Sequence, residues 1–238
     1  MNVRKMFYMS LILNTILLIF IGVLAVRYRW ADKLQERLGW KETLPSQDFL
    51  TTKSWNNTME SLKYEADVVF WGASLTSDGR WQDCFDSVKV CNLGKSGDRL
   101  STMLWRIPQI IAVHPKKIFL AMEQNDMHDL SVDEIEKAYN ILLDSIVKSN
   151  PQATIYLEGL TPLNECQFKR VCDNKKIKKV NELIRNVATE RGFQFIDIYN
   201  IYEHDGQMPM TISTDGQHLK PEAYERWAKV LCPFINND

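Results

Sequence analysis

The chain has 238 residues, of which 45% are hydrophobic and 25% charged, with 29 basic and 30 acidic side chains and a formal net charge of −1 at pH 7. This length and composition fit one globular domain plus a targeting segment. The balanced charge excludes the strong basic field that attracts nucleic acid, so we expect no nucleic-acid partner.

The N-terminal stretch is the first element that the sequence predicts. Residues 6–26 carry no charge, are flanked by basic residues on both sides, and would span roughly 30 Å as a helix, the thickness of a bilayer's hydrocarbon core. This length favours an uncleaved anchor; a signal peptide cleaved near residues 23–25 is the alternative. We therefore predict an N-terminal transmembrane anchor or signal segment over 1–27, and a membrane-anchored protein whose following domain is exported, periplasmic or extracellular.

A linker and a lead-in helix are expected next, over residues 28–64, because Trp55, Met59 and Leu62 recur at helical spacing. Residues 65–238 form the predicted folded domain. The five cysteines include no Cys-x-x-Cys pair, so the sequence predicts no metal site and no cofactor. In an exported domain, Cys166 and Cys172 would be spaced to close a small disulfide loop.

From residue 67 onward, strand-like and helix-like segments alternate. This alternation predicts a parallel sheet with helices on both faces. Helix boundaries are marked by an N-cap serine and capping-box glutamate at Ser131 and Glu134, by Gly192 after a helix, and by Pro221 at a helix start. The predicted strands are 68–71, 88–93, 117–122, 153–157 and 193–198. The predicted helices are 100–111, 132–148, 175–191 and a last helix from Pro221, with long loops over 163–174 and 204–217.

Polar side chains of catalytic type follow several of these strands. Ser74 comes two residues after the glycine that ends the first strand, at the sheet edge where parallel sheets bind ligands. By itself, a serine after a glycine is commonly a turn or helix-cap residue. Asn125 follows the third strand, and Asp215 and His218 stand three residues apart before the last helix. A nucleophile, a base, an orienting acid and an amide donor are the groups that serine-based acyl transfer needs.

Four short motifs in this order resemble the SGNH hydrolases, also called GDSL esterases and lipases. They are Val-Val-Phe-Trp-Gly-Ala-Ser-Leu at 68–75, Asn-Leu-Gly-Lys-Ser-Gly-Asp at 92–98, Gln-Asn-Asp at 124–126, and Thr-Asp-Gly-Gln-His-Leu at 214–219. The resemblance covers about residues 60–236. It implies a flavodoxin-like three-layer α/β/α sandwich with a five-stranded parallel sheet.

The resemblance also implies a catalytic triad. Ser74 would be the nucleophile, His218 the general base and Asp215 the acid that orients it. His204, which precedes an aspartate, is the competing histidine, but it lacks the helix start that follows His218.

An oxyanion hole is implied as well, formed by the N–H of Ser74, the N–H of Gly97 (or of the neighbouring Gly94) and the side-chain amide of Asn125. Two residues depart from the pattern of the family. Ala73 stands where Asp is usual beside the nucleophile, and Glu123 stands where Gly is usual. A carboxylate at position 123 is expected to add bulk near the oxyanion side, and so to narrow the site, alter acyl preference or reduce activity.

The function expected from these residues is a serine esterase that cleaves a small acyl ester through an acyl-enzyme, plausibly deacetylating a carbohydrate or a lipid. Two alternatives remain open. One is a membrane-tethered binding or scaffold domain with little turnover, suggested by Ala73 and Glu123. The other is an O-acyltransferase, because a triad does not distinguish water from an alcohol as the acceptor. The expected partners are thus an acylated glycan or lipid, and the membrane through the N-terminal helix.

Overall fold

In the computed structural model of this chain, the described residues are 47–168 and 173–236, with residues 4, 5, 8, 10, 13–15 and 17–20 near the N-terminus. Most of the predicted anchor, the predicted linker as far as residue 46, and Cys172 lie outside these residues. Among the described residues, no helix is long and apolar enough to cross a membrane. The chain divides into residues 1–47 and 48–238, and the second unit is described here by itself.

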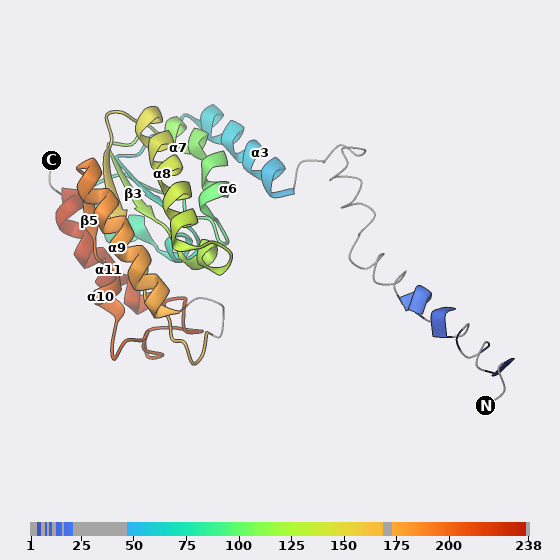
Figure 1. The fold of residues 1–238 in the computed structure, drawn as a ribbon. Coiled ribbons are helices and arrows are strands. Elements are labelled where there is room, and N and C mark those ends of the chain that lie inside the picture. Colours follow the sequence, from blue (N-terminus) through green and yellow to red (C-terminus); the bar gives the residue numbers. More distant parts are fainter. Residues whose placement is uncertain are drawn as a thin grey trace. The chain divides into compact units, whose positions relative to one another are not determined.

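A five-stranded sheet forms the centre of this unit, and all of its strand pairs are parallel. The strand order is β2-β1-β3-β4-β5, the flavodoxin-like order in which ligands bind at the carboxyl ends of the central strands. This confirms the predicted five-stranded parallel sheet (Figure 1). The strands are β1 Val68–Trp71, β2 Val90–Asn92, β3 Lys117–Ala121, β4 Thr154–Glu158 and β5 Gln194–Ile196. The edge strands β2 and β5 are shorter than predicted.

Strand β1 is buried on both faces, as its run of apolar residues predicts. Val69 and Trp71 pack into one core cluster with α6 (Leu100–Trp105), α7 (Ile107–Val113), α8 (Val132–Ser149) and α9 (Asn174–Arg191). Val68 and Phe70 pack into a second cluster with α4 (Ser74–Asp78), α5 (Trp81–Cys84), α10 (Tyr199–Tyr202) and α11 (Pro221–Asn236). The sheet is therefore the middle layer of three, and Figure 1 shows α8 and α9 side by side on one of its faces.

The predicted helix over 100–111 is wrong in one respect, because it is two helices. α6 ends at Trp105, Arg106 has a non-helical backbone with φ −100° and ψ 2°, and α7 begins at Ile107. The cause is Pro108 in the first turn of α7, since proline has no N–H to donate and its ring clashes with a preceding turn of helix. Three predicted helix boundaries are confirmed: Ser131 is the N-cap of α8, Gly192 is the C-cap of α9, and Pro221 is the first residue of α11.

The lead-in helix is present as α3, Gln47–Leu62, and is longer than predicted. Its expected apolar face is only partly correct: Met59 packs against the core, whereas Trp55 and Leu62 are 57% and 64% exposed. Hydrogen bonds attach the helix to the domain. Asn56 Nδ2 donates to the carbonyl of Trp105 at 2.8 Å, and its Oδ1 accepts from Gln109.

Candidate active site

The strand-to-helix turn at residues 72–76 carries Ser74. β1 ends at Trp71, and Ser74 is the first residue of α4. The turn needs glycine at position 72, because a Cβ there would lie 2.1 Å from Thr76 Oγ1 and 2.9 Å from the carbonyl oxygen of Ala121. Ser74 therefore follows β1 within a tight turn, at the carboxyl edge of the sheet, as predicted.

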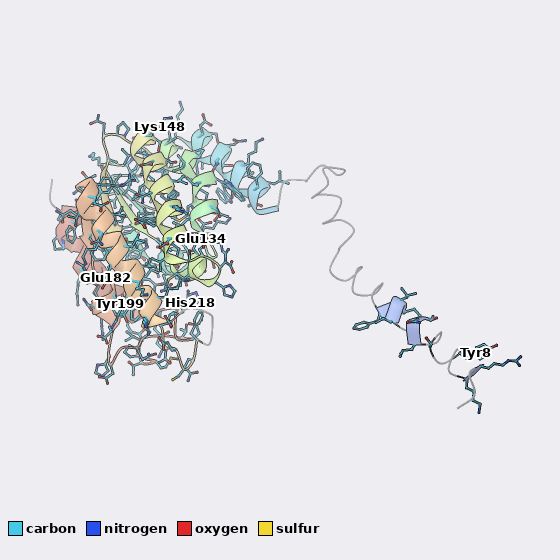
Figure 2. All side chains as sticks on the ribbon, in the orientation of Figure 1. Tyr8, Glu134, Lys148, Glu182, Tyr199 and His218 are labelled. Carbon is cyan, nitrogen blue, oxygen red and sulfur yellow. The ribbon has the colours of Figure 1, made fainter. Side chains whose placement is uncertain are left out.

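The loop before α11 brings a histidine and an aspartate to the same edge. His218 Nε2 lies 3.0 Å from Ser74 Oγ, and His218 Nδ1 lies 2.7 Å from Asp215 Oδ2. The three side chains thus form a continuous hydrogen-bonded series. Figure 2 shows His218 on the side of the domain where Glu134 lies in the first turn of α8, away from Lys148 in its last turn. In a parallel α/β fold, this end holds the carboxyl ends of the strands.

Asp215 is held in an ionised state by several donors. Its Oδ1 accepts from the backbone N–H groups of Gln217 and His218 at 2.9 and 2.8 Å, and its Oδ2 contacts the His218 ring. Partial burial raises the pKa of this carboxyl, but the hydrogen bonds from His218 and Gln217 outweigh it, so the pKa lies below its usual range. An ionised Asp215 fixes a proton on Nδ1 and leaves Nε2 free to accept one.

The tight turn at 213–219 sets the spacing of these two residues. Gly216 has a φ of +92°, a left-handed conformation that favours glycine. Ser213 Oγ donates to the carbonyl of His218 at 2.8 Å and accepts from the N–H of Gly216 at 2.9 Å. Ser213 also pairs with Leu219 in an antiparallel bridge. Because these bonds close the turn, Asp215 and His218, three residues apart, are held with their side chains in contact.

The loops after β2 and β3 carry the predicted oxyanion donors. Gly97 has a φ of +80°, and Gly94 lies so close to the nucleophile turn that a Cβ on it would meet Ser77 N at 2.3 Å. Asn125 lies in the short helix η1 (Gln124–His128), and its Nδ2 donates to the carbonyl of Asp98 at 2.8 Å. An amide nitrogen carries two hydrogens, so this bond leaves one hydrogen for a ligand.

A buried ion pair that the sequence analysis missed supports the same loop. Asp98 pairs with Arg106, both nearly inaccessible to solvent, and Arg106 also donates to the carbonyl of Leu93. Asp126 accepts from the N–H of Leu100 at 2.8 Å and so joins η1 to the start of α6. The signal in the sequence was Arg106, a charged residue inside the mostly apolar run 103–113.

Glu123 contacts the turn that carries Ser74 and is only 5% exposed. Its carboxylate accepts from the backbone N–H groups of Ala73, Leu75 and Thr76 at 2.7, 2.9 and 3.0 Å, and Ser74 Oγ lies 3.3 Å from Oε2. Burial raises the pKa of this carboxyl, and the backbone hydrogen bonds oppose that effect. Sequence reasoning singled out Glu123 as added bulk near the oxyanion side and did not foresee these bonds.

The remaining candidate groups lie elsewhere. His204 has a side chain that is 78% exposed, and its ring nitrogen lies 3.6 Å from the carboxylate of Asp205. His128 pairs with Asp129 on the exposed side of η1. Within the described ranges, no group of three or more His, Cys, Asp or Glu side chains is arranged to hold a metal ion. Cys166 is a free thiol there, and the predicted Cys166–Cys172 pairing falls outside the description because Cys172 does.

At the carboxyl edge of a parallel α/β/α sandwich, a serine, a histidine and an aspartate are hydrogen-bonded in series, the arrangement that acyl transfer by a serine nucleophile requires. The family described as GDSL-like Lipase/Acylhydrolase matches residues 69–226, and the chain belongs to this family. It is therefore a hydrolase that acts on ester bonds, and the resemblance seen in the sequence is confirmed.

Three known proteins are similar to this chain in sequence or in fold. The chain is similar to the platelet-activating factor acetylhydrolase IB subunit alpha2 of Rattus norvegicus, with 27% identity over 179 residues, 72% of this chain and 76% of that protein. Its fold resembles a GDSL-like lipase from Bacteroides thetaiotaomicron (TM-score 0.66, 19% identity, 79% and 98% coverage). It also resembles an acetyl-xylooligosaccharide esterase from Geobacillus (TM-score 0.58, 17% identity, 74% and 96% coverage).

Proposed function

We propose that this protein is a serine esterase that removes a small acyl group, foremost acetyl, from an acylated carbohydrate or lipid. The observation that carries the proposal is the series Ser74–His218–Asp215, with contacts of 3.0 and 2.7 Å. The acetyl group is supported by relatives, since the Rattus norvegicus protein is named an acetylhydrolase and the Geobacillus structure is an acetyl-xylooligosaccharide esterase.

The first half of the reaction is acylation. His218 Nε2 accepts the proton of Ser74 Oγ while Oγ forms a bond to the ester carbonyl carbon. The carbonyl π electrons move to oxygen, and the resulting oxyanion accepts from the N–H of Ser74, the N–H of Gly97 and the amide of Asn125. When the bond to the leaving alcohol breaks, the protonated His218 donates its proton to the alkoxide. The acyl group remains on Ser74.

The second half is deacylation. Water enters the position that the alcohol left, His218 removes its proton, and the water oxygen attacks the acyl carbon. The tetrahedral intermediate collapses, Ser74 Oγ leaves and regains a proton from His218, and the free acid departs. Asp215 keeps the imidazole in one orientation and stabilises its positive charge in both halves.

The test uses the full chain in detergent micelles. We expect hydrolysis of p-nitrophenyl acetate to exceed that of the butyrate and octanoate esters, and we expect Ser74→Ala to abolish it. Wild-type protein that is inert and takes no label from a serine-directed fluorophosphonate would favour the binding or scaffold alternative. Acetyl transfer to an added sugar hydroxyl in preference to water would favour the O-acyltransferase.

Membrane attachment is a further part of the proposal. The uncharged residues 6–26 between basic flanks support an anchor that holds the domain, exported to the periplasm or outside the cell, near an acylated glycan or lipid. The test is to pellet membranes from expressing cells and to treat intact cells or spheroplasts with protease. A domain that stays in the soluble fraction at full length, or that resists protease until the cytoplasm is opened, would contradict the anchored, exported arrangement.

A further inference from the structure

Four consecutive backbone amides surround the nucleophile, at residues 73–76. Three of them, from Ala73, Leu75 and Thr76, donate to the carboxylate of Glu123. The fourth, from Ser74, donates to no group among the described residues. A single buried side chain thus binds three of the four amides at residues 73–76, all except the amide of Ser74 itself.

The bonds are divided between the two carboxylate oxygens. Oε1 accepts from the N–H groups of Ala73 and Thr76 and from the Thr76 hydroxyl, at 2.7, 3.0 and 3.2 Å. Oε2 accepts from the N–H of Leu75 at 2.9 Å and lies 3.3 Å from Ser74 Oγ. Since the two oxygens are rigidly linked, these contacts hold the backbone of the turn and the nucleophile's side chain in one arrangement.

Removing this carboxylate would leave buried donors without partners. The three donor residues, Ala73, Leu75 and Thr76, are all 2% exposed or less. Hydrogen bonds to a charged acceptor are stronger than neutral ones, and a buried N–H that loses its partner bears the full cost of its desolvation. Burial raises the pKa of Glu123, and the hydrogen bonds from the three backbone N–H groups and the Thr76 hydroxyl counter that effect by stabilising the charged form.

The two departures from the family pattern meet in this cluster. Ala73, where Asp is usual, donates its N–H to Glu123, where Gly is usual, at 2.7 Å. Position 73 offers no side-chain acceptor of its own. The acceptor for the turn comes instead from the segment between β3 and η1, 50 residues further along the chain.

We propose that Glu123 is the positioning residue of the nucleophile. It binds the amides of Ala73, Leu75 and Thr76, so that among the amides of residues 73–76 only the Ser74 N–H is left to donate to the oxyanion. Its contact with Ser74 Oγ also holds that oxygen within reach of His218. This role rests on the proposed esterase function. It replaces the expectation that Glu123 narrows the site, since its carboxylate contacts the turn from the buried side.

The experiment compares full-length wild type with Glu123→Gln, which keeps the size of the side chain but turns one acceptor oxygen into an NH₂ donor facing an N–H. The matched control is Glu158→Gln, at a second buried carboxyl that accepts its hydrogen bond from Trp227 Nε1 and not from the amides of residues 73–76. We expect Glu123→Gln to lower kcat by roughly 10²-fold, the loss typical of one oxyanion donor, with KM within about 2-fold. Glu158→Gln should retain the wild-type kcat.

A second readout separates positioning from a general structural role. A trifluoromethyl ketone, which forms a tetrahedral oxyanion on Ser74, should lose affinity for Glu123→Gln by the same factor as kcat, whereas KM reports ground-state binding and should not change. A KM rise at unchanged kcat, or unchanged inhibitor affinity, would overturn the proposal. Loss of kcat in Glu158→Gln as large as in Glu123→Gln would overturn it as well.

Glu123→Asp is the second variant, in case Glu123→Gln fails to fold. It keeps the charge but is one methylene shorter, so it cannot reach all three amides, and the same parallel loss of kcat and inhibitor affinity is expected. Wild-type values in a folded Glu123→Asp would contradict the role. Failure of the esterase proposal is distinguishable, because then the wild type itself neither turns over esters nor binds the ketone.

Discussion

The Oγ atom of Ser74 lies 3.0 Å from Nε2 of His218, although 144 positions separate the two residues in the chain. Ser74 follows β1 in the middle of the sheet, and His218 lies in the loop before α11. Their contact joins two segments that only the complete fold brings together. The predictions below address the residues that hold this pair and the loops beside it.

Asp215→Asn is expected to lower kcat by about 10²-fold or more, because an amide does not stabilise the protonated imidazole and allows the wrong tautomer. The substitution keeps an oxygen for the N–H groups of Gln217 and His218, so the turn should survive. Steady-state kinetics on p-nitrophenyl acetate measure the effect, with far-UV circular dichroism as the control for folding. Rates equal to wild type would remove Asp215 from the triad.

Asn125→Ala is expected to lower kcat by roughly 10²- to 10³-fold, the range seen when one oxyanion donor is lost. The variant also loses the 2.8 Å bond to the carbonyl of Asp98, so its thermal stability must be measured beside its kinetics. Asn140→Ala on α8, whose amide donates to the carbonyl of Glu136, is the control for loss of an amide away from the site. A drop in Tm without a drop in kcat would assign Asn125 a structural role alone.

Arg106→Leu is expected to destabilise the domain by about 3–5 kcal/mol, because it leaves the buried Asp98 without its main cation. Urea unfolding followed by tryptophan fluorescence gives the free energy. The control is Arg80→Leu, which breaks an ion pair with Asp83 whose side chains are 86% and 55% exposed, and which should change stability by less than about 1 kcal/mol. Equal effects of the two substitutions would contradict the assignment of Asp98–Arg106 as a structural pair.

Glu158→Gln is expected to change how stability depends on pH. Complete burial raises the pKa of Glu158 from 4.5 to about 8, despite the hydrogen bond from Trp227 and with a further contribution from Glu123. The folded state therefore holds this proton more tightly than the unfolded state, and the stability it contributes is present below pH 4.5 and lost as the pH rises toward 8.

The glutamine variant cannot ionise and still offers an oxygen to Trp227 Nε1. Its stability should match the wild type near pH 4.5 and exceed it by a few kcal/mol above pH 8, since a tenfold change in proton affinity is worth about 1.4 kcal/mol. Urea unfolding at several pH values measures the difference. A difference between the two proteins that stays constant from pH 4.5 to 9 would show that Glu158 titrates alike in both states.

Much of the fold could be read from local patterns. The apolar run at 68–71, the capping pair Ser131 and Glu134, and Gly192 each mark an element by chemistry that acts within a few residues, and the structure confirms them. The break at Arg106 was missed although Pro108 signals it, because the apolar periodicity continues through the break. The exposure of Trp55 could not be predicted, since periodicity shows which residues share a face but not what the face meets.

By itself, the sequence determined the family, the alternation of strands and helices, and the order of the candidate residues Ser74, Gly97, Asn125, Asp215 and His218, because each depends on motifs and spacing along the chain. Only the tertiary structure decided the strand order, the Asp98–Arg106 pair and the place of Glu123. The carboxylate of Glu123 binds amides 47 to 50 residues away. Contacts at that separation arise from the packing of β1 beside β3, and no local pattern encodes which buried acceptor will meet which donors.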